Sequence, residues 1–384
     1  MREYIFILGR SFELCCAEII SYLKFIGVSY EVLSCDGRVF YIKSEVEIDL
    51  ERLNSILAGV YKAGEVVGKF KNGAEIEKKL FEILKKSEGR VEFGLSFYNI
   101  GGIDRKRLAL NVKRELKEEG LSVRVVFGGS EVSSVPFRSG VRDFIVYRDE
   151  DDLVLVEISC VQDFESWSSR DYDRPEARIK KGMLPPKVGR MMVNLGMFEK
   201  GEVELLCDPF CGVGTVLSEA LMVGLRVIGV DNDGDQVERA EKNLEWFCEA
   251  EKKKMSFKVL RGDAVKLSGV LKEKVDLIVT EPYLGPVELG ERKVSYDKAA
   301  EIARELDDFF IDCLCDWREV LKKDGVVVIA LPSYRYGGKN RQEIVVKRVI
   351  DNREKLGYNL IGEKVSYSRE QAVVVRNIYI LKKK

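Results

Sequence analysis

Several acidic residues in the second half of the chain follow short apolar runs, where open α/β sheets bind their ligands. The segment DPFCGVGT (208–215) begins with an aspartate and contains two glycines. A glycine-rich turn between a strand and a helix lets the backbone approach a ligand closely, and the helix start favours negative charge. Asp231 ends the next apolar run, where a carboxylate can accept both hydroxyls of a ribose. Asp263 ends the third run, where it can accept the amino group of an adenine.

The spacing around these residues favours S-adenosylmethionine as the cofactor. A dinucleotide site favours the pattern G-x-G-x-x-G, whereas here Thr-Val-Leu follows the second glycine. A purely structural interpretation would make the acidic residues helix caps or turn formers. Their position after three successive strands favours the cofactor site. The expected cofactor-binding residues are Asp208, Phe210, Gly212, Gly214, Thr215, Asp231, Asn232, Asp263 and Ala264.

A fourth apolar run ends in TEPYLGP (280–286), which has the features of a catalytic turn. A proline after a strand stiffens the turn and keeps the preceding backbone carbonyls out of the sheet. The Glu281 carboxylate and the Pro282 carbonyl would then form two acceptors for an exocyclic amino group, and Tyr283 could stack on a base. This arrangement suits methylation of a base amine. Methylation at carbon 5 of a pyrimidine fits less well, because the chain has no Pro-Cys dipeptide. The alternative interpretation is an ordinary rigid turn.

The composition excludes several other kinds of site. The chain has no histidine, which removes histidine-based triads and histidine metal sites. Its nine cysteines form no C-x-x-C pair, so we expect neither a zinc ribbon nor a disulfide framework, and no metal. The charge is balanced, with 63 basic and 64 acidic residues, so nucleic-acid binding requires a local patch. No apolar run approaches the roughly 20 residues of a membrane helix, and no secretory signal is apparent, so we expect a cytoplasmic protein without membrane contact.

The chain from about residue 180 alternates strands with amphipathic helices, which predicts a parallel sheet covered on both faces. Residues 343–358 suggest a helix, and 362–368 and 371–382 suggest a closing antiparallel hairpin. Residues 1–160 have a different pattern, which we interpret as two small α+β units, 1–50 and 51–160. The polar stretch 161–181 contains Pro175 and follows neither periodicity, so we expect a linker before a catalytic domain at 182–384.

These segments together resemble the THUMP-domain tRNA guanosine-N2 methyltransferases of the guanosine-10 type, found in archaea and eukaryotes. The resemblance rests on FILGRSFELCCAEI (6–19), RDYDRPEARIKKGMLPPKVGRMMVNLG (170–196), DPFCGVGT (208–215) and SREQAVVVRNIYIL (368–381). It implies an α/β fold, with a Rossmann-like class I methyltransferase domain after N-terminal α+β domains. The N-terminal domains would be a ferredoxin-like unit at 1–50 and an RNA-binding THUMP domain at 51–160. The family shows Asp-Pro-Pro-Tyr where this chain has Glu281-Pro282-Tyr283-Leu284, which puts the exact nucleotide in doubt.

The implied THUMP domain directs attention to basic residues between 104 and 142. The segment DRKRLALNVKRELKEEG (104–120) predicts a helix with Arg107 and Arg114 seven positions apart on one face. A basic helix face is often merely solvated, but a catalytic domain with a large substrate favours RNA contact. The expected RNA-binding residues are Arg107, Lys113, Arg114, Lys117, Arg138 and Arg142.

The sequence is compatible with three functions. The first is methylation of the N2 amine of a tRNA guanosine, with position 10 implied by the resemblance. The second is methylation of the N6 amine of adenine in RNA or DNA, because that amine needs the same two acceptors. The third is a non-catalytic tRNA-binding protein with a decayed site, suggested by the altered turn. The resemblance also implies a small zinc-binding activator protein that docks on the catalytic domain.

Overall fold

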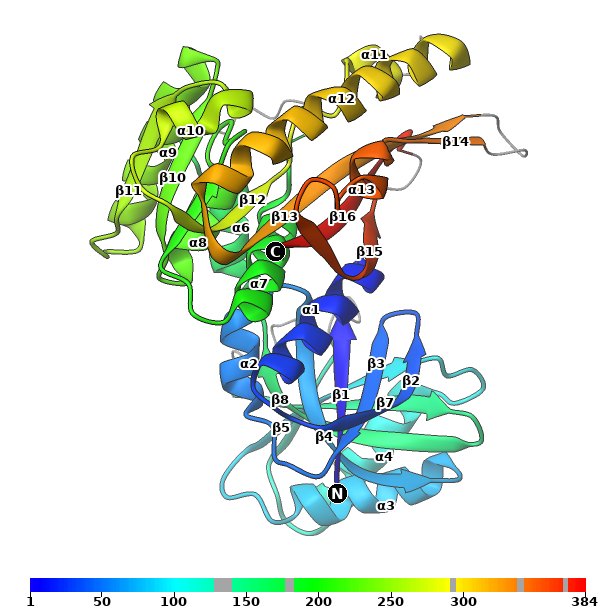
Figure 1. Cartoon of the computed structure of the whole chain (residues 1–384). Helices are drawn as coiled ribbons and strands as arrows, with labels where there is room; N and C mark the ends of the chain where they lie inside the picture. The colour runs from blue at the N-terminus through cyan, green and yellow to red at the C-terminus, as the bar shows by residue number, and fades with distance from the viewer. Residues whose placement is uncertain (128–139, 177–182, 291–294, 337–341, 369–371) are drawn as a thin grey trace. The chain divides into compact units, whose positions relative to one another are not determined.

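The computed structural model contains two compact units (Figure 1). The first unit consists of Met1–Phe12 and Gly27–Phe164, and the second consists of Glu13–Ile26 and Glu165–Lys384. No helix among the described residues has the length and apolar character needed to cross a bilayer. The structure describes residues 1–127, 140–176, 183–290, 295–336, 342–368 and 372–384.

The first unit is a mixed sheet with the strand order β2-β3-β1-β4-β8-β7-β5-β6. Strands from both predicted N-terminal units, 1–50 and 51–160, therefore lie in one sheet. Helices α3 and α4 cover one face with apolar residues such as Leu80 and Val112. The strands are β1 (Arg2–Leu8), β2 (Tyr30–Asp36), β3 (Val39–Ser44), β4 (Val60–Phe70), β5 (Val91–Tyr98), β6 (Val123–Val126), β7 (Arg142–Asp149) and β8 (Asp152–Val161). The described helices are α2 (Leu50–Ile56), α3 (Gly73–Leu84) and α4 (Arg105–Glu118).

The second unit contains the predicted parallel sheet, with the strand order β11-β10-β9-β12-β13-β16-β15. The first five strands run parallel, and β16 pairs antiparallel with both β13 and β15, so the predicted antiparallel end of the sheet is confirmed. All six residues of β12 are buried, as expected for a strand covered on both faces. The strands are β9 (Leu205–Asp208), β10 (Arg226–Asp231), β11 (Phe257–Arg261), β12 (Val275–Thr280), β13 (Leu321–Tyr336), β14 (Gln342–Val345), β15 (Tyr358–Tyr367) and β16 (Val374–Lys383).

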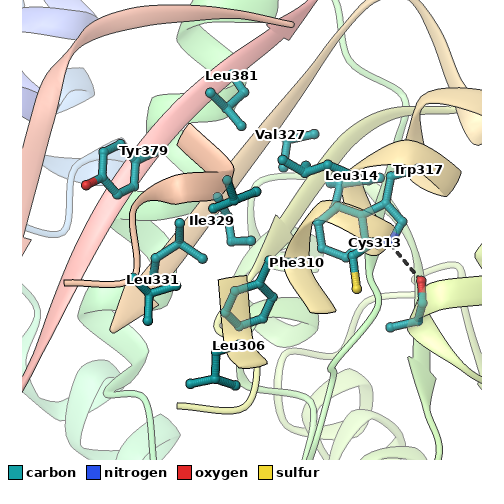
Figure 2. Packing of buried hydrophobic residues seen from close by; sticks show 14 of the residues in the cluster. Leu306, Phe310, Cys313, Leu314, Trp317, Val327, Ile329, Leu331, Tyr379 and Leu381 are labelled. Atoms are coloured by element: carbon teal, nitrogen blue, oxygen red, sulfur yellow. Dashed lines mark hydrogen bonds between the residues drawn. The ribbon is translucent and has the colours of Figure 1, made fainter. Parts of the chain in front are cut away.

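Helices lie on both faces of this sheet. On one face, a Cβ at Gly196 of α7 would lie only 3.1 Å from a methyl carbon of Val328, so this glycine permits a close approach. On the other face, α12 packs Phe310 and Trp317 against β13 residues such as Ile329 (Figure 2). The helices are α1 (Phe12–Phe25), α6 (Phe164–Tyr172), α7 (Pro186–Lys200), α8 (Thr215–Met222), α9 (Gly234–Ala250), the 3-10 helix η1 (Ala264–Lys266), α10 (Leu267–Val270), α11 (Val287–Gly290), α12 (Tyr296–Val320) and α13 (Arg348–Asp351).

Two sequence-based predictions of local structure differ from the fold. The predicted helix at 343–358 is wrong in its first part, because β14 pairs antiparallel with the end of β13 and only the short α13 is helical. The β-branched run Ile-Val-Val at 344–346 suits that strand. Part of the predicted linker is also regular, since α6 covers 164–172. The residue that α6 buries is Arg170, so the sequence has no periodic apolar pattern that would indicate this helix.

Candidate active site

Asp208 ends β9, an inner strand of the parallel sheet, and its side chain is almost fully buried. Thr280, the last residue of β12, donates a hydrogen bond from Oγ1 to Asp208 Oδ1 at 2.6 Å, and the backbone N–H of Phe210 donates to the same oxygen at 3.1 Å. Burial is the main reason why the pKa of Asp208 is raised to about 7; the two hydrogen bonds oppose this rise, and the carboxylates of Asp231 and Glu281 add to it. The ends of β9 and β12 are therefore joined, and carboxylates gather at this edge of the sheet.

The glycine loop, residues 208–214, makes the tight turn that its sequence predicts. Gly212 and Gly214 have φ angles of 50° and 86°, a region that side-chain-bearing residues rarely adopt. Asp231 Oδ2 accepts the Gly212 N–H at 2.9 Å, so the acidic end of β10 holds the loop in place. A Cβ built at Gly212 would meet no heavy atom within 4 Å. The loop therefore borders open space at that residue.

Asp231 and Asp263 keep acceptor capacity for a ligand. An ionised carboxylate has about four acceptor sites, and Asp231 uses two of them, for the N–H groups of Gly212 and Asp233. Asp263 caps η1 by accepting the Val265 N–H at 3.0 Å through Oδ1, and its Oδ2 accepts no hydrogen bond from the described residues. The capping interpretation of Asp263 is thus correct, yet it leaves one oxygen for an adenine amino group. The residues present fit an adenosine-bearing cofactor.

The remaining predicted cofactor residues lie close to the same edge. The ring of Phe210 meets Trp317 edge-on, with centroids 6.3 Å apart. Trp317 Nε1 donates to the buried Ala264 carbonyl at 2.9 Å, which ties η1 to α12. Asn232 is exposed just beyond β10, and Thr215 is buried as the first residue of α8. These residues follow β9, β10 and β11 in turn, at the carboxyl ends of neighbouring parallel strands.

Glu281 follows β12 and forms an ion pair that the sequence does not reveal. Arg376 of β16 donates from Nε to Glu281 Oε2 at 2.5 Å and from Nη2 to Glu281 Oε1 at 3.1 Å. Both side chains are largely buried, at 13% exposed for Glu281 and 8% for Arg376. A two-pronged contact of this kind fixes the plane of the carboxylate as well as its position. An ionised carboxylate has about four acceptor sites, and the described residues use two of those of Glu281.

The rest of the catalytic turn is fixed by Tyr334 of β13. Its hydroxyl donates to the Leu284 carbonyl at 2.6 Å, and a Cβ at Gly285, where φ is 92°, would lie 2.6 Å from the same hydroxyl. Pro282 is buried, and its carbonyl accepts no hydrogen bond from the part of the chain that the structure describes. Tyr283 is 55% exposed. The turn thus offers a carboxylate, an unused carbonyl and an open aromatic ring.

The predicted RNA-binding residues of α4 share an exposed side of that helix. Arg107, Arg114 and Lys117 are exposed and Lys113 is half-buried, and no ion pair joins any of the four to another described residue. The opposite side packs on the sheet of the first unit. A shallow depression of about 360 Å³ is lined by Leu110, Lys113, Arg114, Lys117 and Glu118.

Arg142, another predicted RNA-binding residue, is engaged by other residues of the first unit. Arg142 lies on β7, where its guanidinium pairs with Glu157 at 2.6 Å and donates to Ser87 at 3.1 Å. Its charge is therefore already used within the sheet. Arg138 lies outside the described residues.

Sequence reasoning missed Arg376, although a signal for it exists. A charged residue inside the apolar run VVVRNIYIL must find a partner if that strand is buried. The sequence gives no hint that the partner is Glu281, 95 residues away. Arg174, which donates to Thr215 at 2.9 Å, carries no comparable signal because its segment is polar throughout.

Known methyltransferases resemble this chain in sequence and in fold. Residues 175–337 match the family described as the RMKL-like methyltransferase domain. The fold also resembles the crystal structure of TrmN from Thermus thermophilus over 100% of both chains, with a TM-score of 0.57 at 16% identity. That likeness confirms the predicted α/β methyltransferase fold.

Two curated relatives are similar in sequence. A tRNA (guanine(10)-N2)-dimethyltransferase of Methanothermobacter thermautotrophicus is 28% identical over 325 residues, which cover 84% of this chain and 86% of the relative. A probable tRNA (guanine(10)-N2)-dimethyltransferase of Methanothermococcus thermolithotrophicus is 35% identical over 145 residues, 38% of this chain and 78% of the relative. The family predicted from the motifs is thereby confirmed, while the THUMP domain stays a prediction. The chain belongs to the tRNA (guanine(10)-N2)-dimethyltransferase family.

Proposed function

We propose that this protein transfers a methyl group from S-adenosylmethionine to the exocyclic N2 amine of guanosine 10 in tRNA. The observation that carries the chemistry is the turn after β12, where the Glu281 carboxylate and the unused Pro282 carbonyl follow a strand joined to the glycine loop through Thr280 and Asp208. The curated relatives, named for tRNA guanine-10 N2 dimethylation, support the choice of nucleotide.

The methyl donor is S-adenosylmethionine, whose positively charged sulfonium makes its methyl group transferable. Asp231 would accept the ribose hydroxyls and Asp263 the adenine amino group, while Gly212 and Gly214 let the loop backbone approach. The carboxylates of Asp208, Asp231 and Glu281 gather at this edge, which favours a cationic ligand.

The target amine must be brought out of its base stack before it can react. Extruding a base costs a few kcal/mol, which contacts in the pocket must offset. The open ring of Tyr283 would supply stacking, worth roughly 1–3 kcal/mol per base. This residue would therefore act in base capture rather than in the transfer itself.

The chemical problem is the low nucleophilicity of an amine whose lone pair is delocalised into the guanine ring. Glu281 Oε and the Pro282 carbonyl would accept the two N–H protons and so direct the lone pair toward the methyl group. Glu281 would then take the proton that the methylated nitrogen releases. A methylated exocyclic nitrogen is a strong acid, so a weak base such as a carboxylate is sufficient to take its proton.

Substrate affinity would come from the first unit. The exposed cations Arg107, Arg114 and Lys117 would contact tRNA phosphates, and 51–160 would act as the THUMP domain. The zinc-binding activator and the cytoplasmic location are part of the same proposal, on the strength of the family resemblance.

Incubation with tRNA and methyl-labelled S-adenosylmethionine, followed by nucleoside mass spectrometry, tests the proposal. We expect N2-methylated guanosine at position 10, in mono- or dimethylated form. Glu281→Gln should retain some activity because it keeps an acceptor oxygen, and Glu281→Ala should retain far less, with cofactor affinity unchanged in both. N6-methyladenosine as the product would favour the adenine alternative. Wild-type rates in Glu281→Ala would show that the turn is only structural.

A further inference from the structure

Arg174 follows helix α6, and its side chain reaches the first residue of α8. Nη1 donates to Thr215 Oγ1 at 2.9 Å, and the residue is only 7% exposed. Its Nε is buried and has no hydrogen-bond partner among the described residues. In the part of the chain that the structure describes, Arg174 makes no ion pair, although Asp171 and Glu219 act on it from farther away. This buried guanidinium therefore has one hydrogen bond and no close counterion among the described residues.

The backbone N–H groups at the start of α8, next to Arg174, also lack hydrogen-bond acceptors in the described part of the chain. Its N-cap is Gly214, which has no side chain to cap the helix. The Ser218 N–H bonds to the Gly214 carbonyl, but the N–H groups of Thr215, Val216 and Leu217 meet no acceptor among the described residues. Unpaired N–H groups and the helix dipole make this end attractive to a negative charge. Two independent features, the helix start and Arg174, thus favour an anion here.

The backbone around Arg174 is held against the glycine loop without help from its own side chain. Buried Asn243 accepts the Glu176 N–H at 3.0 Å through Oδ1 and donates from Nδ2 to the Val213 carbonyl at 2.9 Å. One amide side chain therefore ties residue 176 to residue 213. The guanidinium is consequently placed for a ligand before that ligand binds.

The buried carboxylate that acts on Arg174, that of Glu219, is already paired with two other arginines. Glu219 is fully buried and pairs with Arg170 at 2.9 Å and with Arg190 at 3.1 Å. Burial lowers the pKa of Arg174, while Asp171 and Glu219 only partly oppose that effect. Burying a cation without a close counterion costs free energy, which a ligand carboxylate would offset.

We infer that Arg174 and the first turn of α8 bind the α-carboxylate of the methionine part of the cofactor. This inference rests on S-adenosylmethionine as the methyl donor and assigns a residue to the end of that molecule farthest from the adenine. A guanidinium presents paired N–H donors that match the two oxygens of a carboxylate. The Thr215 hydroxyl, already bonded to Arg174, orients that fork.

Calorimetry with two adenosine ligands separates this role from a structural one. S-adenosylhomocysteine carries the carboxylate, whereas 5′-methylthioadenosine has the same adenosine and sulfur but no amino-acid part. Arg174→Ala should weaken S-adenosylhomocysteine binding by roughly tenfold or more and leave methylthioadenosine binding unchanged. Arg174→Lys keeps the positive charge but lacks the paired N–H donors of the guanidinium. Its affinity for S-adenosylhomocysteine should lie between those of wild type and Arg174→Ala. Arg239→Ala is the matched control, since this half-buried arginine lies 3.9 Å from Glu176 in the same region.

The possible outcomes are distinct. Equal loss of both ligands in Arg174→Ala would show that Arg174 only supports the fold of the loop. Unchanged S-adenosylhomocysteine binding, or a wild type that binds the two ligands equally, would remove the carboxylate assignment. A wild type that binds neither ligand would instead contradict the proposed function itself.

Discussion

Arg376 donates from Nε and Nη2 to the two carboxylate oxygens of Glu281, although 95 residues separate them in the chain. Glu281 stands at the end of β12, and Arg376 lies on β16, two strands away in the sheet. β13 separates these strands and contributes Tyr334, which holds the Leu284 carbonyl. The turn after β12 is therefore held in place by strands that come later in the chain.

We expect Arg376→Gln to lower the single-turnover rate of tRNA methylation by roughly 10²-fold, because a misplaced catalytic group loses much of its effect. S-adenosylhomocysteine affinity should be unchanged, since Glu281, the carboxylate that Arg376 holds, is not one of the predicted cofactor residues. Arg376→Lys keeps the charge and should recover part of the rate. Arg348→Gln, which removes an exposed pair with Asp308, is the control. Equal rates in Arg376→Gln and wild type would show that the pair only stabilises the sheet.

Asp231→Ala should weaken S-adenosylhomocysteine binding by about 1.5–3 kcal/mol, or roughly tenfold or more in Kd. The loss combines the missing ribose acceptor with a looser glycine loop, since Asp231 also holds the Gly212 N–H. Isothermal titration calorimetry measures the change. Asp233→Ala serves as the control because that neighbouring carboxylate caps α9. If the two variants bind equally well, the ribose contact is misassigned.

Reversing Arg107 and Arg114 to Glu should weaken tRNA binding and flatten its dependence on salt. Each lost phosphate contact lowers the slope of log affinity against log salt by about 0.7–0.9. Filter binding at several salt concentrations gives this slope. Arg124→Glu is a control in the same unit, because Arg124 lies on β6 rather than on α4 and its guanidinium is 3.7 Å from the carboxylate of Glu92. A slope that stays at the wild-type value would exclude α4 as a phosphate-binding surface.

The stability of the protein should depend on the ionisation of Asp208. Burial raises the pKa of this carboxyl from 3.8 to about 7. Between these values the folded protein keeps a proton that the unfolded chain releases, so stability falls as the pH rises through the window. The asparagine of Asp208→Asn cannot ionise. From about pH 5 to about pH 8, the free energy of unfolding of this variant should therefore rise relative to that of wild type by on the order of a few kcal/mol. Melting temperatures of the two proteins across this pH range measure the change.

Asp276→Asn provides the matching control. Burial raises the pKa of Asp276, but hydrogen bonds from Lys322 and from the Glu204 and Leu205 N–H groups outweigh it and lower the pKa. This group titrates below the same pH window, so the difference between Asp276→Asn and wild type should stay constant across it. A constant difference for Asp208→Asn as well would mean that Asp208 is ionised throughout.

The local features of the catalytic domain could be predicted from the sequence. Apolar runs, glycines and terminal acids are properties of neighbouring residues, and the apolar run predicted to end at Asp231 is strand β10, which ends at that residue. The same local reading failed at 342–345, where pairing with β13 decides the conformation, and at α6, where the buried face is charged. Hydrophobic periodicity detects helices that bury apolar residues, so a helix that buries an arginine has no such pattern in its sequence.

The sequence by itself determined which residues end each strand and therefore which acids and glycines meet at one edge of the sheet. Only the tertiary structure decided how those residues are partnered. The pairing of Arg376 with Glu281, the contact of Arg174 with Thr215 and the bond from Thr280 to Asp208 each join separate segments. Such contacts depend on which strands lie next to one another in the sheet. That spatial order is set by packing across the whole sheet rather than by any one segment.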